Sequence, residues 1–118
     1  MKPDEIDAVV PFGCGAPAMD AAEAAAIRGV FGNRAATLPL ITLSPLIGSC
    51  GAGFGAVAAS VAVQCLRTGM LPARLNGDAS MGVDAAAAPA RKADLKAVLV
   101  CTPSLGGQNA AIVVRRMA

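Results

Sequence analysis

The chain has 118 residues and a net charge of +2 at neutral pH; 55% of its residues are hydrophobic and only 15% are charged. A chain of this length forms one domain at most, and a domain so small has difficulty burying that much apolar surface. The sequence contains no histidine, Trp or Tyr, and its basic residues are spread along the chain. Histidine chemistry and nucleic-acid binding through a basic patch or stacked aromatic rings are therefore not expected.

The first half of the chain alternates short apolar runs with longer helical patterns. Ile6–Pro11 predicts a buried strand, and Pro17 precedes a helix expected over Ala18–Gly32. Leu38–Ser44 predicts a second apolar strand, and a loop rich in glycine then leads into a second helix over Ala52–Arg67. Because strand, glycine loop and helix occur twice, we expect a parallel sheet with crossover helices.

The second half ends in a predicted hairpin. Leu71–Asp94 contains several prolines and glycines and an alanine run, which indicates irregular surface chain. Leu95–Thr102 and Asn109–Arg116 then predict two strands, joined by six residues that include Gly106 and Gly107. A connection of that length favours an antiparallel turn-back.

The cysteines and the uncharged middle of the chain argue against a metal site and a membrane span. Cys14, Cys50, Cys65 and Cys101 are widely spaced with no C-x-x-C pair, so zinc is not expected, and reduced, mostly buried thiols favour a cytoplasmic chain. Ala35–Leu66 carries no charge, and Leu46–Leu66 within it is long enough to cross a bilayer. Its Ala, Gly and Ser content instead favours a helix buried by protein.

The two glycine loops leave a nucleotide or acyl site open. Residues 13–18 and 51–56 both match G-x-G-x-x-A between a strand and a helix, a geometry that exposes backbone N–H groups to a pyrophosphate. The second strand, Leu38–Ser44, lacks the acidic residue that would hold a ribose. A module that binds acyl, coenzyme A or nucleotide groups is therefore kept as the alternative function.

Three ordered segments carry a family resemblance. "VVPFGCGAPAMDAAE" is similar to H-G-T-G-T-P-x-N-D-x-x-E, "ITLSPLIGSCGAGFGA" to K-P-x-x-G-H-x-x-G-A-x-G-A, and "TPSLGGQNA" to N-S-F-G-F-G-G-x-N-A. The chain thus resembles the C-terminal part of the β-ketoacyl-acyl carrier protein synthases, of the thiolase superfamily. The resemblance extends over residues 1–118, expected to form one partial domain. It implies an α/β fold with a mixed, mostly parallel sheet, crossover helices and a closing antiparallel hairpin.

The family's catalytic residues are replaced in this chain. Phe12 stands where the resemblance places the first catalytic histidine, Ser49 where it places the second, and Ser44 where it places a lysine. The family's activity is acyl transfer, in which the histidines support decarboxylation and stabilise negative charge on the thioester oxygen. Phenylalanine can do neither, so no catalytic residue, cofactor or metal is expected and the chain is not expected to be active alone.

Other positions of the motifs are expected to hold the loops or line a pocket. These pocket and structural positions are Gly13, Cys14, Gly15, Asp20, Glu23, Gly48, Cys50, Phe54, Leu105, Gly106, Gly107 and Asn109. Phe12 and Met19 are further candidates for filling the pocket. Cys14 and Cys50, near helix N-termini, leave open a substitute thiol nucleophile.

The resemblance implies a function in fatty acid or polyketide biosynthesis. A catalytically silent homologue of the chain-length-factor type pairs with an active ketosynthase and shapes the pocket in which the acyl chain grows. The expected partner is a catalytic ketosynthase subunit or the N-terminal half of the family's fold, and an acyl carrier protein is a further candidate. Open edge strands and apolar helix faces are expected on the isolated chain.

Overall fold

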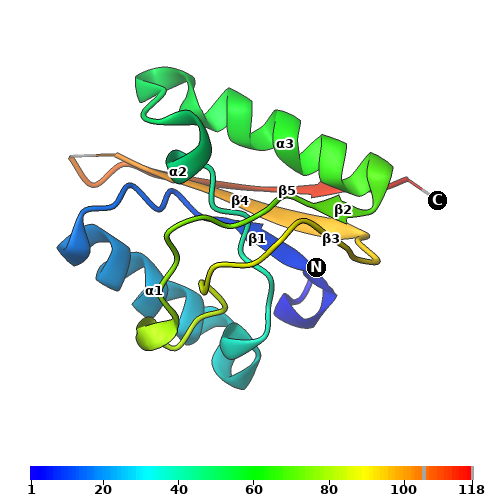
Figure 1. Cartoon of the computed structure of the whole chain (residues 1–118), viewed down its shortest axis with the longest axis horizontal. Helices are drawn as coiled ribbons and strands as arrows, with labels where there is room; N and C mark the ends of the chain where they lie inside the picture. The colour runs from blue at the N-terminus through cyan, green and yellow to red at the C-terminus, as the bar shows by residue number, and fades with distance from the viewer. Residues whose placement is uncertain (105, 118) are drawn as a thin grey trace.

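The computed structural model of the chain describes residues 1–104 and 106–117. A three-stranded sheet lies between two long helices (Figure 1). Its strand order is β1 (Ala8–Val10), β4 (Ala97–Pro103) and β5 (Asn109–Arg115). β1 runs parallel to β4, and β4 pairs antiparallel with β5. The predicted α/β class, mixed sheet and closing antiparallel hairpin are therefore confirmed.

The sheet is less parallel than the sequence predicts, because the expected strand Leu38–Ser44 pairs at few points. Leu40 forms an isolated parallel bridge with Val9, in which the Val9 N–H donates to the Pro39 carbonyl. Pro39 has no N–H group to donate to an extended ladder. The segment then ends in the short helix α2 (Ser44–Ile47), which has Pro45 in its first turn. Three parallel pairs join β1 to β4, against seven antiparallel pairs between β4 and β5.

The two long helices lie close to their predicted positions. α1 (Pro17–Phe31) begins at the expected proline and is followed by a 3₁₀ turn at Gly32–Ala36. α3 (Phe54–Thr68) follows a 3₁₀ turn at Gly51–Gly53, so the helix proper starts two residues later than predicted, and it ends at the left-handed Gly69. Among the described helices, none is both long and apolar enough to cross a membrane.

The stretch predicted to be irregular contains a small second sheet. β2 (Met70–Leu71) pairs antiparallel with β3 (Arg91–Lys92), and further 3₁₀ turns occupy Pro3–Glu5 and Ala79–Met81. Strands of two residues have no periodicity, so sequence patterns do not reveal them.

Each face of the central sheet packs against one helix (Figure 1). Val98 and Val100 of β4 are buried with Phe54 and Ala58 of α3 in one cluster. On the opposite face Val9 of β1 is buried in a second cluster with Ile27 and Phe31 of α1. The alternation of side chains along each strand thus divides the core into two layers.

An ion pair lies within the segment between β2 and β3, and its arginine also contacts the chain beside β1. Arg74 is only 4% exposed, and its Nη2 lies 2.9 Å from Oδ1 of Asp84. Its Nη1 donates to the backbone carbonyls of Asp84 and Leu40. The guanidinium therefore ties this segment to the strand-like residues beside β1.

Candidate functional site

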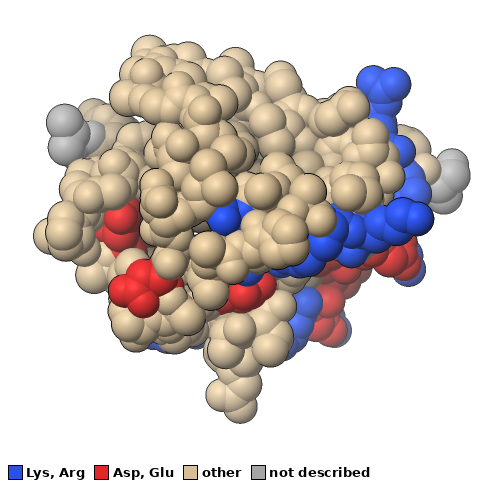
Figure 2. Space-filling view, viewed as in Figure 1, with Lys and Arg blue, Asp and Glu red and all other residues tan. Residues whose placement is uncertain are grey.

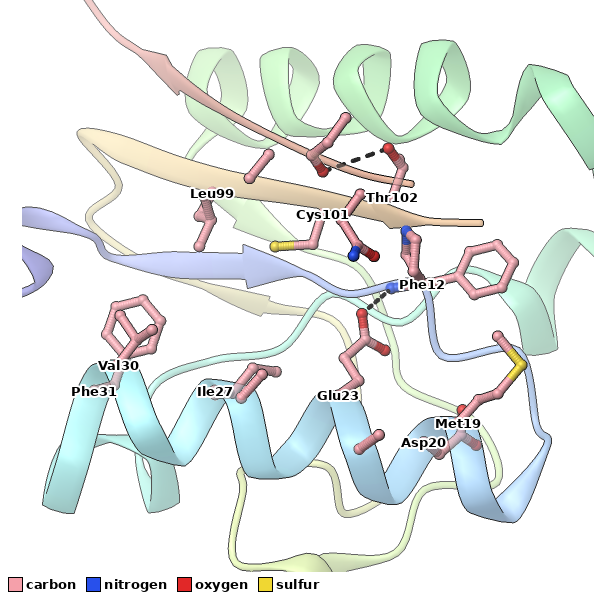
Figure 3. Close-up of a pocket in the computed structure, with 16 residues that line it drawn as sticks. Phe12, Met19, Asp20, Glu23, Ile27, Val30, Phe31, Leu99, Cys101 and Thr102 are labelled. Carbon is pink, nitrogen blue, oxygen red and sulfur yellow. Dashed lines mark hydrogen bonds between the residues drawn. The ribbon is translucent and has the colours of Figure 1, made fainter. Parts of the chain in front are cut away.

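The loop after β1 is held by a carboxylate from α1. The backbone N–H of Phe12 donates to Oε1 of Glu23 at 2.8 Å (Figure 3). The backbone N–H of Gly13 donates to Oε2 of the same carboxylate at 2.9 Å. Gly13 and Gly15 have φ of +51° and +82°, values that L side chains rarely adopt. The two glycines and Glu23 of the motif thus act together to shape the turn that presents Phe12.

Phe12 lies where the two glycine-containing loops meet. Its half-buried ring packs edge to face against Phe54 at the start of α3, with ring centroids 5.0 Å apart and an interplanar angle of 88°. Edge-to-face pairs of this kind contribute about 0.5–1.5 kcal/mol beyond the area that they bury. The hydroxyl of Ser44 donates to the Phe12 carbonyl at 3.1 Å. The structure therefore brings together Phe12, Ser44 and Phe54, which are far apart in the sequence.

The second loop places Ser49 and Cys50 near the surface. Ser49 is exposed, and its hydroxyl accepts only a long hydrogen bond of 3.4 Å from the Gly51 N–H among its described contacts. Gly48 has φ +71° and Cys50 is half-buried against the α3 core cluster. Ser49 has no general base within hydrogen-bonding reach in the described part of the chain, and a serine nucleophile needs one.

Cys14 has neighbours that do not activate a thiol. Its Sγ lies 3.8 Å from the Met19 sulfur and 3.9 Å from Oδ1 of Asp20. A cation, an imidazole, a metal or a helix N-terminus can activate a cysteine. Cys14 precedes the N-terminus of α1, but the charged group beside its Sγ is a carboxylate. The contacts of Cys14 favour a packing role.

Hydrogen bonds between its own residues shape the turn between β4 and β5, which carries the last of the three motifs. Gly107 has φ +81°, and the side-chain amide of Asn109 donates to its carbonyl at 3.2 Å. The Gly106 N–H donates to the Ser104 carbonyl at 3.1 Å. Leu105, predicted to line the pocket, lies outside the described residues.

A cavity of about 470 Å³ lies between α1 and the β4–β5 hairpin (Figure 3). Phe12, Met19 and Asn109, which the sequence analysis names as candidate positions, line it together with Ile27, Leu99 and Cys101. Burial and, to a smaller extent, the nearby Glu23 carboxylate raise the pKa of the Cys101 thiol. The Cys101 thiol therefore stays neutral and acts as a small apolar side chain in the wall of the cavity. The alternation of side chains between the two faces of the strand Leu95–Thr102 could have indicated this position.

A second cavity, of about 320 Å³, lies on the other side of the glycine loop. Gly13, Gly15 and Asp20 line it together with Asn76 and Asp78 from the segment before β3. Hydrogen bonds from the hydroxyl and the backbone N–H of Ser80 lower the pKa of Asp78. Nothing in the sequence indicated that this segment would lie over the loop. Within residues 1–104 and 106–117, no group of three or more His, Cys, Asp or Glu residues is placed to hold a metal ion.

Comparison with known protein structures shows the same fold in larger proteins. The ishigamide ketosynthase/chain length factor superposes with a TM-score of 0.90 at 24% identity, over all of this chain and 30% of that one. A β-ketoacyl synthase from Burkholderia phymatum superposes with a TM-score of 0.82 at 24% identity, over 29% of its length. The C-terminal thiolase-like fold that the sequence predicts is therefore confirmed.

Sequence comparison gives the family. The tetracenomycin polyketide synthase ketoacyl synthase beta subunit of Streptomyces glaucescens is 32% identical over 119 aligned residues, which cover 98% of this chain. The chain spans only 29% of that relative's length. The family model described as "Beta-ketoacyl synthase, C-terminal domain" matches residues 1–78, the part that contains both glycine loops, α1 and α3. The chain belongs to the family of the β-ketoacyl synthase C-terminal domain.

Proposed function

We propose that this chain is a non-catalytic β-ketoacyl synthase-like subunit or fragment that pairs with a catalytic ketosynthase and shapes an acyl-chain pocket. The observation that carries the proposal is Phe12, whose ring occupies the apex of the first loop and packs on Phe54. A loop that presents a catalytic side chain elsewhere in the family here presents an apolar one. The names of the relatives, a ketoacyl synthase beta subunit and a ketosynthase/chain length factor, agree with this role.

The contacts of the remaining positions support a silent site. The Ser44 hydroxyl already donates to the Phe12 carbonyl, and the Ser49 hydroxyl is a neutral donor where the resemblance places a histidine, so the donors that would stabilise an oxyanion are reduced. Loss of one such donor costs about 10²–10³ in rate. The proposal therefore assigns condensation to the partner and pocket shaping to this chain.

The alternative, a site for nucleotide or acyl-coenzyme A groups, is disfavoured by the first loop. The amides of Phe12 and Gly13, which an incoming phosphate would use, already donate to the Glu23 carboxylate. A second anion at the same amides would meet a like charge at close range, which is unfavourable. The loop hydrogen bonds favour the ketosynthase-like function over phosphate binding.

In this proposal the 118 residues form one partial domain, completed by the partner. Apolar surface that the chain cannot bury alone would be covered in that assembly. An acyl carrier protein is a further proposed partner of the assembly, since it would deliver the acyl chain. A cytoplasmic location stays a prediction from the sequence.

The test is co-expression of the chain with a ketosynthase from the same source, followed by gel filtration with light scattering. We expect a stoichiometric complex whose product length shifts upward for Phe12→Ala and less for Phe12→Leu, because a smaller side chain enlarges the pocket. A chain that aggregates alone and ignores the ketosynthase would refute the proposal. If both variants form the complex but give a product of the same length as the unmodified chain, the pocket role of Phe12 is refuted.

A further inference from the structure

β5 is an edge strand whose outer side has no neighbouring strand among the described residues. It lies last in the strand order β1, β4, β5 (Figure 1). A strand in this position presents a row of backbone N–H and carbonyl groups, which proteins commonly protect with a proline, a bulge or a charged side chain. Asn109–Val114 contains no proline and no charged residue, and it pairs with β4 residue for residue, without a bulge. The edge is therefore unprotected over most of its length.

The β4–β5 ladder fixes which backbone groups point outward. The Ser104 N–H donates to the Gln108 carbonyl at 2.9 Å at one end of the ladder. The Arg116 N–H donates to the Lys96 carbonyl at 2.9 Å at the other end. Hydrogen-bonded and non-hydrogen-bonded pairs alternate along an antiparallel ladder, so the even-numbered residues of β5 direct their backbone groups at β4. The outward-directed groups belong to Asn109, Ala111, Val113 and Arg115.

The side chains of β5 are open on both faces of the sheet. Ile112 and Val113 are 51% and 43% exposed, although β-branched residues suit a surface that neighbouring strands cover. Ile112 pairs with Val100, which is buried in the cluster with α3, so it lies on that face. Val113 pairs with Leu99, which packs against the cluster with α1, so it lies on the opposite face. Exposure on both faces at the same point is what an additional strand at the edge would relieve.

A second copy of β5 fits this edge in an antiparallel arrangement. When Ile112 lies on a two-fold axis and faces its counterpart, Ala111 of each copy pairs with Val113 of the other. Asn109 then pairs with Arg115, and every outward-directed backbone group has a partner. The Ile112 pair is of the non-hydrogen-bonded kind, with Cβ atoms about 4.5–5.5 Å apart. Under two-fold symmetry the same surface serves both copies, as in the commonest form of dimer.

The charges favour this arrangement over a parallel one. Arg115, at the C-terminal end, is the one charged residue of β5. Figure 2 shows the basic side chains mostly toward the end of the molecule at which β5 finishes. A parallel pair would bring these like charges side by side, whereas an antiparallel pair keeps them apart and places Arg115 opposite the Asn109 amide. The distribution of charge along β5 therefore favours a two-fold partner.

We propose that the outer edge of β5 is the interface at which two copies of this chain pair, joining their three-stranded sheets into one continuous sheet. The proposal goes beyond the proposed function, because it concerns association of the chain with itself and requires no ketosynthase. It accounts for the exposed Ile112 and Val113 and for the lack of a protecting residue between Asn109 and Val114.

The first test is the mass of the full chain and its variants, measured by gel filtration with light scattering over a range of concentrations. We expect the unmodified chain to reach the mass of a dimer. Ile112→Lys places two ammonium groups face to face and should weaken self-association by about 10- to 30-fold, and Ile112→Glu should do the same. A mixture of the two variants should regain a dimer that contains one of each. Val63→Lys changes a 43% exposed side chain on α3 and is the matched control, which should leave self-association unchanged.

Hydrogen exchange of the β5 amides gives a second readout that needs no substitution. In the dimer, the N–H groups of Ala111 and Val113 should exchange within about tenfold as slowly as those of Ala110 and Val114, which bond to β4. An unpaired edge would leave the first two roughly 100-fold faster. Exchange that is quenched and then read by NMR in an aprotic solvent measures a precipitated chain as well.

Three outcomes would overturn the proposal. One is a chain that stays monomeric at the highest concentration tested, or that associates while Ala111 and Val113 exchange fast; either leaves the proposed function untouched. Another is a dimer that neither Ile112 variant weakens. The third is a complex in which the ketosynthase slows exchange of these amides in a single copy of the chain, because an extended segment of that partner would then occupy the edge.

Discussion

Replacement of Glu23 by alanine tests whether one carboxylate holds the first loop in place. The side chain accepts the N–H groups of Phe12 and Gly13 at 2.8 and 2.9 Å. Each hydrogen bond to a charged group contributes about 1.5–3 kcal/mol, and the half-burial of Glu23 places both near the lower end. We therefore expect Glu23→Ala to lower the free energy of unfolding by about 3 kcal/mol.

Glutamine at the same position should give an intermediate result. Its amide oxygen can accept one of the two N–H groups, while its NH₂ group faces the other, so the expected loss is about half, roughly 1.5 kcal/mol. Urea denaturation of the partner complex or of the isolated chain, with an unchanged m-value, measures both losses. Asp20→Ala is the matched control, because this neighbouring carboxylate has no described backbone hydrogen bond, and it should cost less than about 1 kcal/mol. A loss below about 1 kcal/mol for Glu23→Ala, or equal losses for alanine and glutamine, would refute the reasoning.

Three further predictions concern the rest of the fold. Arg74→Met should lower the free energy of unfolding in urea by about 2 kcal/mol, because it removes the buried one of the two arginines that pair with Asp84 and leaves only Arg91, at 3.6 Å. Stability should fall as the pH rises above about 8.5, because burial raises the pKa of Cys65 in the folded chain. The unfolded chain then loses the thiol proton at a lower pH than the folded chain does, which favours unfolding. Cys65→Ala should make this fall shallower in thermal melts measured across this pH range. Gly77→Ala should lower stability by about 1–3 kcal/mol in urea, because its Cβ would overlap the Ala85 carbonyl oxygen.

Controls exist for each of these changes. Arg116 pairs with the exposed Asp94 at 3.5 Å, so Arg116→Met should cost under about 1 kcal/mol, and an equal cost at both arginines would contradict the buried-pair argument. A stability that is flat from pH 8 to pH 10 would contradict the cysteine prediction. Gly29 lies in α1 with open space at its Cβ position, so Gly29→Ala should stabilise by about 0.5–1 kcal/mol. Equal effects at the two glycines would contradict the steric argument.

Local signals in the sequence anticipated much of the fold. The apolar runs, Pro17 and the glycine-containing turn predicted β1, α1, α3 and the β4–β5 hairpin close to their observed bounds. These features depend on periodicity and on the backbone preferences of proline and glycine, which act over a few residues. The strand at Leu38–Ser44 was overestimated, because apolar residues predict burial better than they predict a paired ladder.

What the sequence by itself determined is the family and the replacement of the two histidines that the resemblance leads one to expect. The ordered motifs name the fold, and Phe12 and Ser49 cannot act as histidines in any structure. Tertiary structure alone decided the contact between Phe12 and Phe54, the hydrogen bond from Arg74 to the Leu40 carbonyl, and the cavity between α1 and the β4–β5 hairpin. Such contacts join residues distant along the chain, and they depend on how whole elements pack, which no short-range pattern specifies.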